Sequence, residues 1–359
     1  MKKILIFFLF FSIYAKASDR LNILTWAGYI QPEILKKFEN ETGIKLHIDY
    51  IDNNYTLESK LMATSHDYDI TVPTLAPFFV RQVQFGLFQS LDHSRLVNYK
   101  NIDPRVISFE KEANNSDAYA IPFMLDSIGI GYDNNKLKQI MPDASTNSLK
   151  MIFDPEIVKN FSHCGVEILD SAEEITALVL LYLGKDPNSH LEEDLKQVAE
   201  VLHKIRPYIS SINGNLYFNN LANGDNCLVI GYSGDIVQAR EISYKSGKNI
   251  DIKYIFPKEG SIMTLDLMAI PKNSPNRENA YRFLDFILRP EINAEIANYI
   301  GYTSPNYKSY PLIKKEFFDN HNIYPLQDKN KKFYTLNIPS AKYNRSRNLM
   351  WMKFLSDEK

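Results

Sequence analysis

Hydrophobic positions in the first part of the chain alternate between the spacing of strands and the spacing of helices. Residues 21–24 read as a short apolar strand, and residues 32–38 carry apolar side chains at helical spacing, with Gly43 as the helix stop. The further elements predicted here are a strand over 45–51, a helix over 57–62 and a strand over 68–72. Such alternation predicts a mostly parallel sheet covered by helices.

The same alternation returns in the second half of the chain. The predicted elements are a strand over 165–169, a helix over 173–183, strands over 227–231, 253–256 and 265–270, a helix over 280–287 and a last helix opened by Pro290. We find no internal repeat and no long flexible linker between the halves. The sequence therefore predicts an α/β protein of two lobes that are joined by strands crossing directly from one to the other.

The first 17 residues have the features of a secretory signal peptide. Lys2 and Lys3 precede an uncharged apolar stretch over 4–13, and Ala15-Lys16-Ala17 is a small-x-small cleavage pattern. The alternative, an uncleaved anchor, is disfavoured because the apolar stretch is much shorter than a membrane-spanning helix. No cysteine follows the small residues, so we expect a mature chain that starts near Ser18, carries no lipid, does not insert into the membrane and resides in a bacterial periplasm.

Charge and cysteine content narrow the choice of partners. The formal net charge of the whole chain is −2, and it becomes −5 once Lys2, Lys3 and Lys16 leave with the leader. This balance disfavours nucleic acid and is compatible with a cationic ligand. Two cysteines, Cys164 and Cys227, in an oxidising compartment predict one disulfide, with two buried thiols as the alternative.

Aromatic and acidic residues gather in the loops that follow the predicted strands. They are Trp26 and Tyr29, then Asp170, Glu173 and Glu174, then Tyr232 and Asp235, and further on Asp266 and Tyr302. Ligands of open parallel sheets bind outside the carboxyl ends of the strands. Aromatic faces and carboxylates are what a desolvated ammonium group needs. Each residue alone could be an ordinary core aromatic or a solvated acid, so the prediction of a cation site depends on their joint placement.

Catalytic and metal-site patterns are absent from the sequence. Residues 231–234 do not complete a nucleophile elbow, and Gly129-Ile130-Gly131 does not continue into a dinucleotide-binding loop. The seven histidines are scattered and form no zinc-type spacing with each other or with the cysteines. We therefore expect a binding protein, not an enzyme, with no cofactor and no metal.

A series of short motifs in order resembles the periplasmic putrescine-binding proteins of polyamine ABC importers. The motifs are Thr25-Trp26-Ala27-Gly28-Tyr29-Ile30, Lys60-Leu61-Met62-Ala63, Tyr68-Asp69-Ile70-Thr71-Val72-Pro73-Thr74, Gly129-Ile130-Gly131-Tyr132, Cys164-Gly165-Val166, Tyr182-Leu183-Gly184-Lys185-Asp186-Pro187, Leu221-Ala222-Asn223-Gly224-Asp225 and Phe256-Pro257-Lys258-Glu259-Gly260. The likeness spans nearly the whole mature chain, and no single motif carries it.

The resemblance implies a type II periplasmic-binding-protein fold whose two lobes close on a polyamine, putrescine first and spermidine second. We expect the first lobe to comprise residues 18–127 and 258–301, and the second lobe residues 128–257 and 302–359. The ligand-binding residues that the resemblance implies are Trp26, Tyr29, Thr74, Glu174, Tyr232, Asp235, Asp266 and Tyr302. An inner-membrane permease is the implied partner, and we expect the protein to be a monomer.

Three departures from the family pattern concern this site. Tyr232 replaces a tryptophan, Ala27-Gly28 replaces a small hydroxyl residue followed by an acid, and Thr264 replaces an aromatic residue. Loss of the acid at Gly28 removes a partner for one ammonium group. Asp126 stands where the family has a small uncharged residue, so we expect it to supply the compensating charge, with a solvent-facing loop acid as the alternative. Other ligands that remain open are agmatine and cadaverine, and the remaining alternative role is that of a ligand-dependent polyamine sensor.

Overall fold

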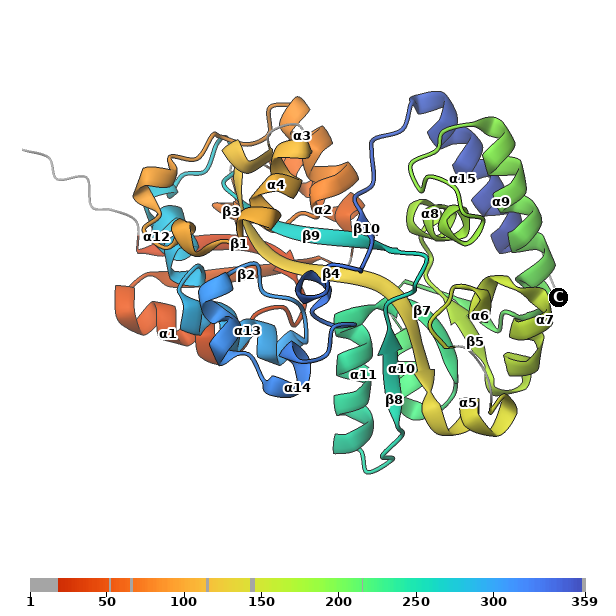
Figure 1. Cartoon of the computed structure of the whole chain (residues 1–359). Coiled ribbons are helices and arrows are strands. Elements are labelled where there is room, and N and C mark those ends of the chain that lie inside the picture. The colour runs from red at the N-terminus through yellow and green to blue at the C-terminus, as the bar shows by residue number, and fades with distance from the viewer. Residues whose placement is uncertain are drawn as a thin grey trace, which may run out of the picture.

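Two α/β lobes lie side by side in the computed structural model and are joined by long strands (Figure 1). The structure describes residues 19–51, 53–64, 67–113, 116–142, 146–214 and 216–356. The expected signal peptide, residues 1–17, lies outside the described residues.

The first lobe starts with strands and helices at the predicted places. Strand β1 (Arg20–Trp26) pairs in parallel with β2 (Lys45–Ile51) and β3 (Ile70–Thr71). Helix α1 (Pro32–Thr42) buries Ile34 and Phe38, and Gly43 ends it with a positive φ of 72° that suits glycine. Helix α2 (Asn54–Thr64) connects β2 to β3.

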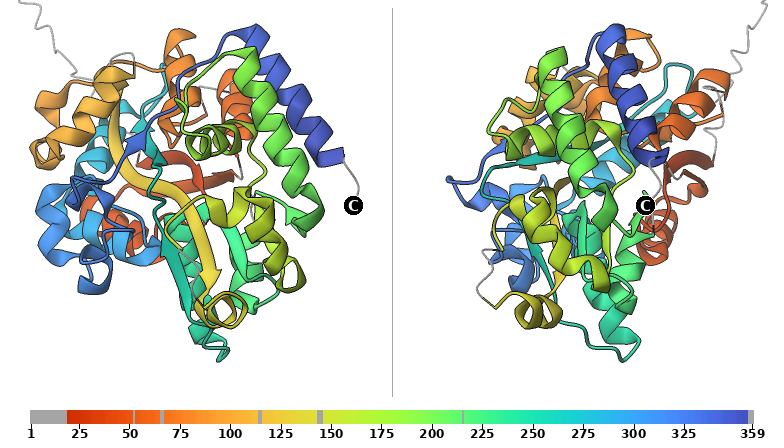
Figure 2. Two further views of the ribbon diagram at one scale, coloured as in Figure 1. Left: turned by 45° about the vertical axis from the view of Figure 1, so that its right-hand side comes forward. Right: turned by 90° about the vertical axis from the view of Figure 1, so that its right-hand side faces the viewer.

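The second lobe has its own parallel strands, in which β5 (Val166–Ile168) pairs with β6 (Ser211–Ile212) and β7 (Leu228–Tyr232). Its main helices are α8 (Ala172–Tyr182), α9 (Glu192–Ile205), α10 (Tyr217–Asn223), α11 (Ser233–Lys245) and α15 (Ala341–Ser356). The C-terminal helix α15 packs against α8 and α9 at the outer end of this lobe (Figure 2).

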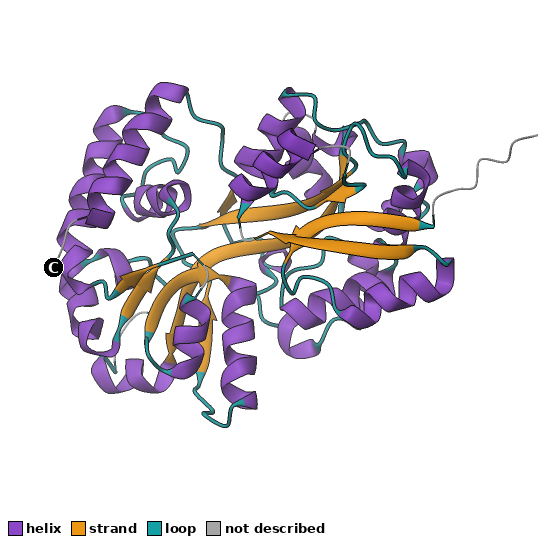
Figure 3. Cartoon of the chain, turned by 180° about the vertical axis from the view of Figure 1, so that it is seen from behind, coloured by secondary structure: helices purple, strands orange, loops and turns teal. Residues whose placement is uncertain are grey.

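Two long antiparallel strands, β4 (Ala120–Asp133) and β9 (Ser261–Ala269), run through both lobes. Strands β7 and β8 (Ile252–Ile255) pair antiparallel with β4, and β10 (Phe333–Tyr334) pairs in parallel with β9. The resulting sheet has the order β2-β1-β3-β9-β4-β7-β5-β6, and helices cover both of its faces (Figure 3). The prediction of a mostly parallel sheet is therefore wrong at the centre, because the chain passes between the lobes along strands that run in opposite directions.

The remaining helices surround these strands. They are α3 (Val80–Gln84), α4 (Pro104–Glu112), α5 (Asn134–Ile140), α6 (Lys150–Phe153), α7 (Pro155–Val158), α12 (Arg277–Ile287), α13 (Pro290–Ile300) and α14 (Lys315–Phe318). None of the helices in the described part of the chain has the length and hydrophobicity to span a membrane.

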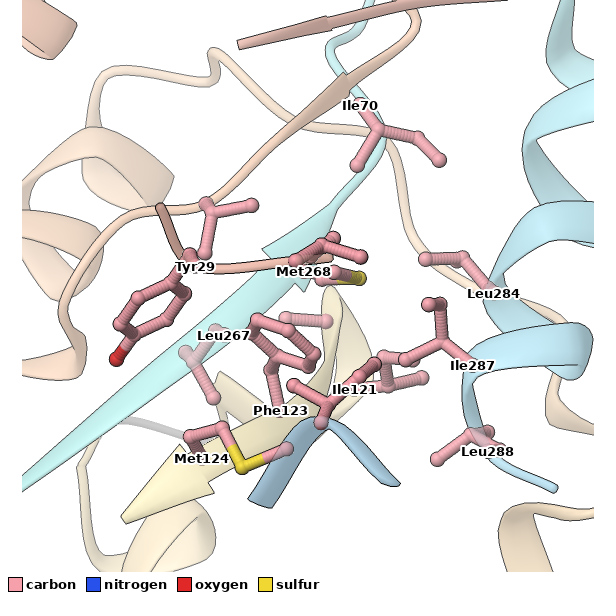
Figure 4. Close-up of a cluster of buried hydrophobic side chains, with 14 of the residues drawn as sticks. Tyr29, Ile70, Ile121, Phe123, Met124, Leu267, Met268, Leu284, Ile287 and Leu288 are labelled. Atoms are coloured by element: carbon pink, nitrogen blue, oxygen red, sulfur yellow. The ribbon is translucent and has the colours of Figure 1, made fainter. Parts of the chain in front are cut away.

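Each lobe has its own hydrophobic core, and the crossing strands pass from one core to the other. On β4, Leu125 belongs to the first core and Ile128 to the second. On β9, Ile262 belongs to the second core and Met263 to the first. Figure 4 shows part of the first core, with Tyr29 at its edge and the Tyr29 hydroxyl pointing away from the aliphatic side chains.

The segment 302–359, which we assigned to the second lobe, divides between the two cores. Phe317, Tyr324 and Leu326 are buried in the first core, whereas Trp351 and Phe354 are buried in the second. We propose on this ground that the first lobe extends to about residue 326 and that only the C-terminal part of the segment belongs to the second lobe.

The predicted disulfide is present, with 5.5 Å between the Cα atoms of Cys164 and Cys227. It ties the segment before β5 to the start of β7, across 63 residues of sequence. In the chain-entropy model, closing a loop of this length stabilises the fold by about 4 kcal/mol.

Candidate functional site

The first wall of the site is built around Asp266 on β9. Thr74, which follows β3, donates a hydrogen bond from Oγ1 to Asp266 Oδ1 at 2.7 Å, and the Tyr29 hydroxyl donates to Asp266 Oδ2. Asn54, at the start of α2, holds Thr74 in place through its Oδ1, which accepts from the Thr74 backbone N–H at 3.1 Å. The chain after β1 and after β3 thus brings Tyr29 and Thr74 to Asp266 in the middle of β9, and the three predicted residues form one hydrogen-bonded group.

A second carboxylate, Asp235, lies in the first turn of α11. It accepts hydrogen bonds from the hydroxyl of Tyr217 and, at 3.4 Å, from the hydroxyl of Tyr302. The Tyr302 ring packs edge-on against Tyr29 with 5.4 Å between ring centroids, which links this group to the first. Gly234 permits that packing, because a Cβ at this position would lie 1.7 Å from the Tyr302 ring.

The third carboxylate, Glu174, is in the first turn of α8 on the second lobe. The hydroxyl of Tyr232, at the end of β7, lies 3.0 Å and 2.9 Å from its two oxygens. The predicted pair of aromatic and acid on the second lobe is therefore in contact.

Asp126 lies on β4 where the strand crosses between the lobes, and it is 4% exposed. Its Oδ1 accepts from the Ser233 hydroxyl, from the backbone N–H of Ser127 at 2.7 Å and from that of Gly234 at 3.4 Å. Its Oδ2 is buried and has no hydrogen-bond partner among the described residues. Asp126 is thus a buried acid, which contradicts the alternative of a solvent-facing loop residue.

Burial raises the pKa of all four carboxyl groups, because water no longer stabilises the charged form. The pKa rises to about 8 for Asp126, about 7 for Glu174, and about 6 for Asp235 and for Asp266. Neighbouring acids add to the effect: Asp235 raises the pKa of Asp126, and Asp266 raises that of Glu174. No lysine, arginine or histidine forms an ion pair with any of the four within the described ranges.

A pocket joins the two lobes beside these groups. Its walls include Thr74 from the first lobe, Glu174 from the second, and Thr264, one of the positions that depart from the family pattern. Thr335 and Leu336, from the chain just after β10, close it. The pocket thus lies between the lobes at the end of the site that holds Glu174.

Trp26 is less clearly part of this arrangement than the other predicted residues. It ends β1, packs partly buried against the first core, and its indole Nε1 has no hydrogen-bond partner in the described part of the chain. Ala27 and Gly28 after it are exposed, and a Cβ at Gly28 would meet open space. Its role as a ligand-binding residue therefore stays a prediction.

Two of the acids that follow the predicted strands, Asp170 and Glu173, are not part of this group, because they pair with side chains of the C-terminal helix. Asp170 accepts a hydrogen bond from Trp351 Nε1 at 2.8 Å, and Glu173 forms an ion pair with Arg347 at 2.7 Å. The C-terminal helix α15 supplies both partners, and its position relative to α8 could not be read from the sequence.

Sequence reasoning missed three residues that support the site: Asn54, Tyr217 and Ser233. Each acts through another site residue, as a donor to Thr74, Asp235 or Asp126. Tyr217 lies on α10, a helix that the hydrophobic pattern did not predict. Ser233 and Asp235 could have been linked by their shared position in the first turn of α11.

Two α/β lobes with a pocket between them, and with hydrogen-bonded acids and tyrosines beside it, are typical of a solute-binding protein. The chain belongs to the bacterial extracellular solute-binding protein family, whose model matches residues 33–323. This membership agrees with the expectation of binding without catalysis. The described residues contain no group of three or more His, Cys, Asp or Glu side chains placed to hold a metal ion.

Relatives and solved structures of the same kind match almost the whole chain. The chain is 38% identical over 344 residues to the putrescine-binding periplasmic protein PotF of Escherichia coli K12, covering 95% of this chain and 93% of that protein. It is also 38% identical over 345 residues to the putrescine-binding periplasmic protein SpuD of Pseudomonas aeruginosa UCBPP-PA14, covering 95% and 94%. The spermidine/putrescine ABC transporter substrate-binding protein PotD of Streptococcus pneumoniae has the same fold, with a TM-score of 0.80 at 24% identity, covering 94% and 98%. The predicted two-lobed binding-protein fold is confirmed.

Proposed function

We propose that this protein captures an aliphatic polyamine, putrescine first and spermidine second, and delivers it to an ABC importer. Two relatives that match 95% of the chain are named for putrescine binding. Agmatine and cadaverine, or a role as a polyamine sensor, are less favoured alternatives.

The observation that carries the proposal is a group of four acids with no basic partner in the described ranges. Asp126, Glu174, Asp235 and Asp266 lie at or beside the pocket between the lobes, and their partners are hydroxyl or backbone groups. A buried carboxylate with no opposite charge is costly. A ligand with ammonium groups at both ends would supply the missing positive charge, and carboxylates bind ammonium through charge-assisted hydrogen bonds.

The proposed roles of the individual side chains are supported by the hydrogen bonds around the acids. Asp235 and Asp266 anchor ammonium groups, and Trp26, Tyr232 and Tyr302 pack on the methylene chain. Glu174 adds charge directly or through a water molecule. Tyr29 and Thr74 orient Asp266, to which both donate hydrogen bonds.

Asp126 fits the role of compensating for the acid that is missing at Gly28. Its Oδ2 is buried and has no partner in the described ranges, so one acceptor is free for a ligand or a bridging water. Because Asp126 lies on the strand that crosses between the lobes, a cation bound there would also favour one arrangement of the two lobes.

Delivery requires export, closure and docking. We propose that residues 1–17 direct the chain to the periplasm and are removed, and that the ligand stabilises the closed form through contacts with both lobes. The closed monomer then presents its surface to the permease subunits.

Calorimetric titration of the mature protein tests the proposal directly. Putrescine and spermidine should bind with one site per chain, and cadaverine and agmatine more weakly. Succinate, which has a similar length and the opposite charge, serves as the control and should not compete with putrescine for this cleft. A protein that binds none of the four amines would contradict the proposal.

A further inference from the structure

A second pocket lies beside the polyamine cleft, and the site described above does not use it. Its walls come from α8, from α15, from residues 187–190 and from residues 336–339, and Pro77 of the first lobe borders it. The empty space between these walls is about 350 Å³ when the open solvent at its mouth is included. Leu336 lines both pockets, so the two are neighbours.

Three nearly buried side chains that line this pocket each have a polar atom without a hydrogen-bond partner among the described residues. Thr176, Tyr343 and Arg347 are 3%, 4% and 6% exposed. The unpartnered atoms are Thr176 Oγ1, Tyr343 Oη and Arg347 Nε, for which no partner occurs among the described residues. Buried polar groups are rarely left unpaired, because each loses its hydrogen bonds to water. Three such atoms in one pocket therefore point to something that binds there.

All three atoms can donate a hydrogen bond at the same time, which determines the chemistry of the ligand. The guanidinium N–H can only donate, and the two hydroxyl groups are free to donate. The matching ligand must offer several acceptor lone pairs within a small volume. A carboxylate or another oxyanion meets that requirement, and arginine binds such groups strongly.

Charge in the pocket sets the expected strength of binding. Arg347 NH2 already pairs with Glu173 Oε1 at 2.7 Å and with Asn344 Oδ1 at 2.6 Å. The Arg347–Glu173 ion pair has no net charge. The ligand would therefore be held mainly by hydrogen bonds, and we expect a modest affinity. The ring of His190 packs on Tyr343 with 4.8 Å between centroids and limits the pocket on its exposed side.

We propose that this pocket is a second ligand site, in which Thr176, Tyr343 and Arg347 bind a small oxyanion, best a carboxylate. The site is separate from the carboxylate cleft and takes a ligand of the opposite charge. Because Pro77 of the first lobe and α8 of the second both border it, an occupant would contact both lobes and favour their closed arrangement.

The test uses the mature protein with sodium acetate, sodium succinate and sodium phosphate, each against sodium chloride at the same ionic strength. Calorimetry and thermal unfolding should show binding and a higher Tm with at least one of the oxyanions and not with chloride. Acetate and succinate without phosphate would identify a carboxylate site, and phosphate alone a phosphate site; both outcomes support the proposal. No response to any oxyanion would overturn it and leave water as the occupant.

Near-isosteric variants locate the site. Tyr343→Phe and Thr176→Val each remove one hydroxyl group and should weaken oxyanion binding by about fivefold to tenfold. Their putrescine affinity should be unchanged. Tyr244→Phe, at a 73% exposed tyrosine on α11, is the matched control and should bind the oxyanion like the unmodified protein. Unchanged oxyanion affinity in both pocket variants would place the ion elsewhere and overturn the proposal; if one variant does not fold, the other decides.

Discussion

Two groups of carboxylates in this molecule have no basic partner among the described residues, and they differ in what donates to them. Asp69, fully buried before β3, accepts from the backbone N–H groups of Asn22 and Asn276 at 2.8 Å each, from Asn276 Nδ2 at 3.0 Å and from the Ser274 hydroxyl at 2.8 Å. Glu167, fully buried on β5, accepts from the side-chain amides of Asn213, Asn220 and Asn226. Amide donors surround both acids and fix them in place.

The acids of the cleft have fewer partners, and most of these are hydroxyl groups. Asp266 is held by Tyr29 and Thr74, and Asp235 by Tyr217 and Tyr302. A hydroxyl can turn to donate or accept, so it can adapt when a cation arrives, whereas an amide N–H can only donate. In this comparison, donors that are mostly amide groups hold the carboxylates that support the fold, and hydroxyl donors hold those of the proposed ligand site.

The largest effect on folding should come from Asp69→Ala. The change leaves several N–H groups without an acceptor in the first lobe and should lower the free energy of unfolding by about 2–4 kcal/mol. Urea denaturation of the ligand-free protein measures it. Putrescine affinity, measured where the variant is folded, should stay within about twofold of the unmodified protein. A loss of affinity without a loss of stability would contradict the assignment of Asp69 to the fold.

Asp235→Asn should have the opposite effect to Asp69→Ala: putrescine affinity falls and stability is retained. Removal of the charge should weaken putrescine binding by about tenfold or more, because a charge-assisted hydrogen bond is lost. The ligand-free protein should be no less stable, since an unpaired buried charge is removed. Calorimetry and thermal unfolding check the two parts, and Asp319→Asn, at an exposed acid on the far side of α14, is the control. Unchanged affinity in a folded Asp235→Asn variant would contradict the site.

The pH dependence should separate the ligand-free from the bound protein. In the ligand-free fold the pKa values of the cleft acids are raised to about 6 to 8, whereas in the unfolded chain they are near 4. Between pH 4 and pH 8 the folded state therefore holds more protons than the unfolded state. Stability of the ligand-free protein should therefore fall as the pH rises through this window. A bound dication favours the ionised acids, so binding should tighten from pH 5 to pH 8 by up to about tenfold per unit for each proton released.

Calorimetry in buffers of different ionisation enthalpy measures those protons. Release of protons on putrescine binding near pH 6.5 is the expected result. Binding that is independent of pH and releases no protons would show that the cleft acids are already ionised without ligand.

Asp126→Ala tests a smaller effect. If Asp126 compensates for the acid missing at Gly28, its removal should weaken putrescine binding by about threefold to tenfold. Gly28→Asp in the same background should restore part of the loss, although Gly28 has a positive φ of 71° that a side chain adopts at some cost. If calorimetry finds unchanged affinity in Asp126→Ala, the compensation is excluded.

Tyr217→Phe should give the smallest effect. Tyr217 donates to Asp235 and also accepts from the Tyr232 backbone N–H at 3.1 Å, so it positions the end of β7 and the acid together. Loss of the hydroxyl should weaken putrescine binding by about threefold. It should also raise the pKa of Asp235 further, because one stabilising hydrogen bond to the ionised form is lost. A shift of the pH profile to higher pH distinguishes this positioning role from a purely structural one.

The sequence by itself determined many of the local elements, the two α/β lobes and the disulfide, but β4, α9, α10 and α15 were not among the predicted elements. Hydrophobic spacing marked α1 and α13 because each buries one face against a core, and short apolar runs marked β1 and β7 because most of their residues are buried. The sequence also placed most of the acids and aromatic residues of the site at strand ends.

Only the tertiary structure decided how those elements pair and which acids remain without partners. The antiparallel passage of β4 and β9 through both lobes, and the division of residues 302–359 between two cores, depend on contacts between segments far apart in the sequence. The same holds for Glu173, which resembles Glu174 in sequence but is neutralised by Arg347 from the C-terminal helix. Whether a carboxylate is satisfied depends on the donors that reach it, and long-range packing brings those donors together.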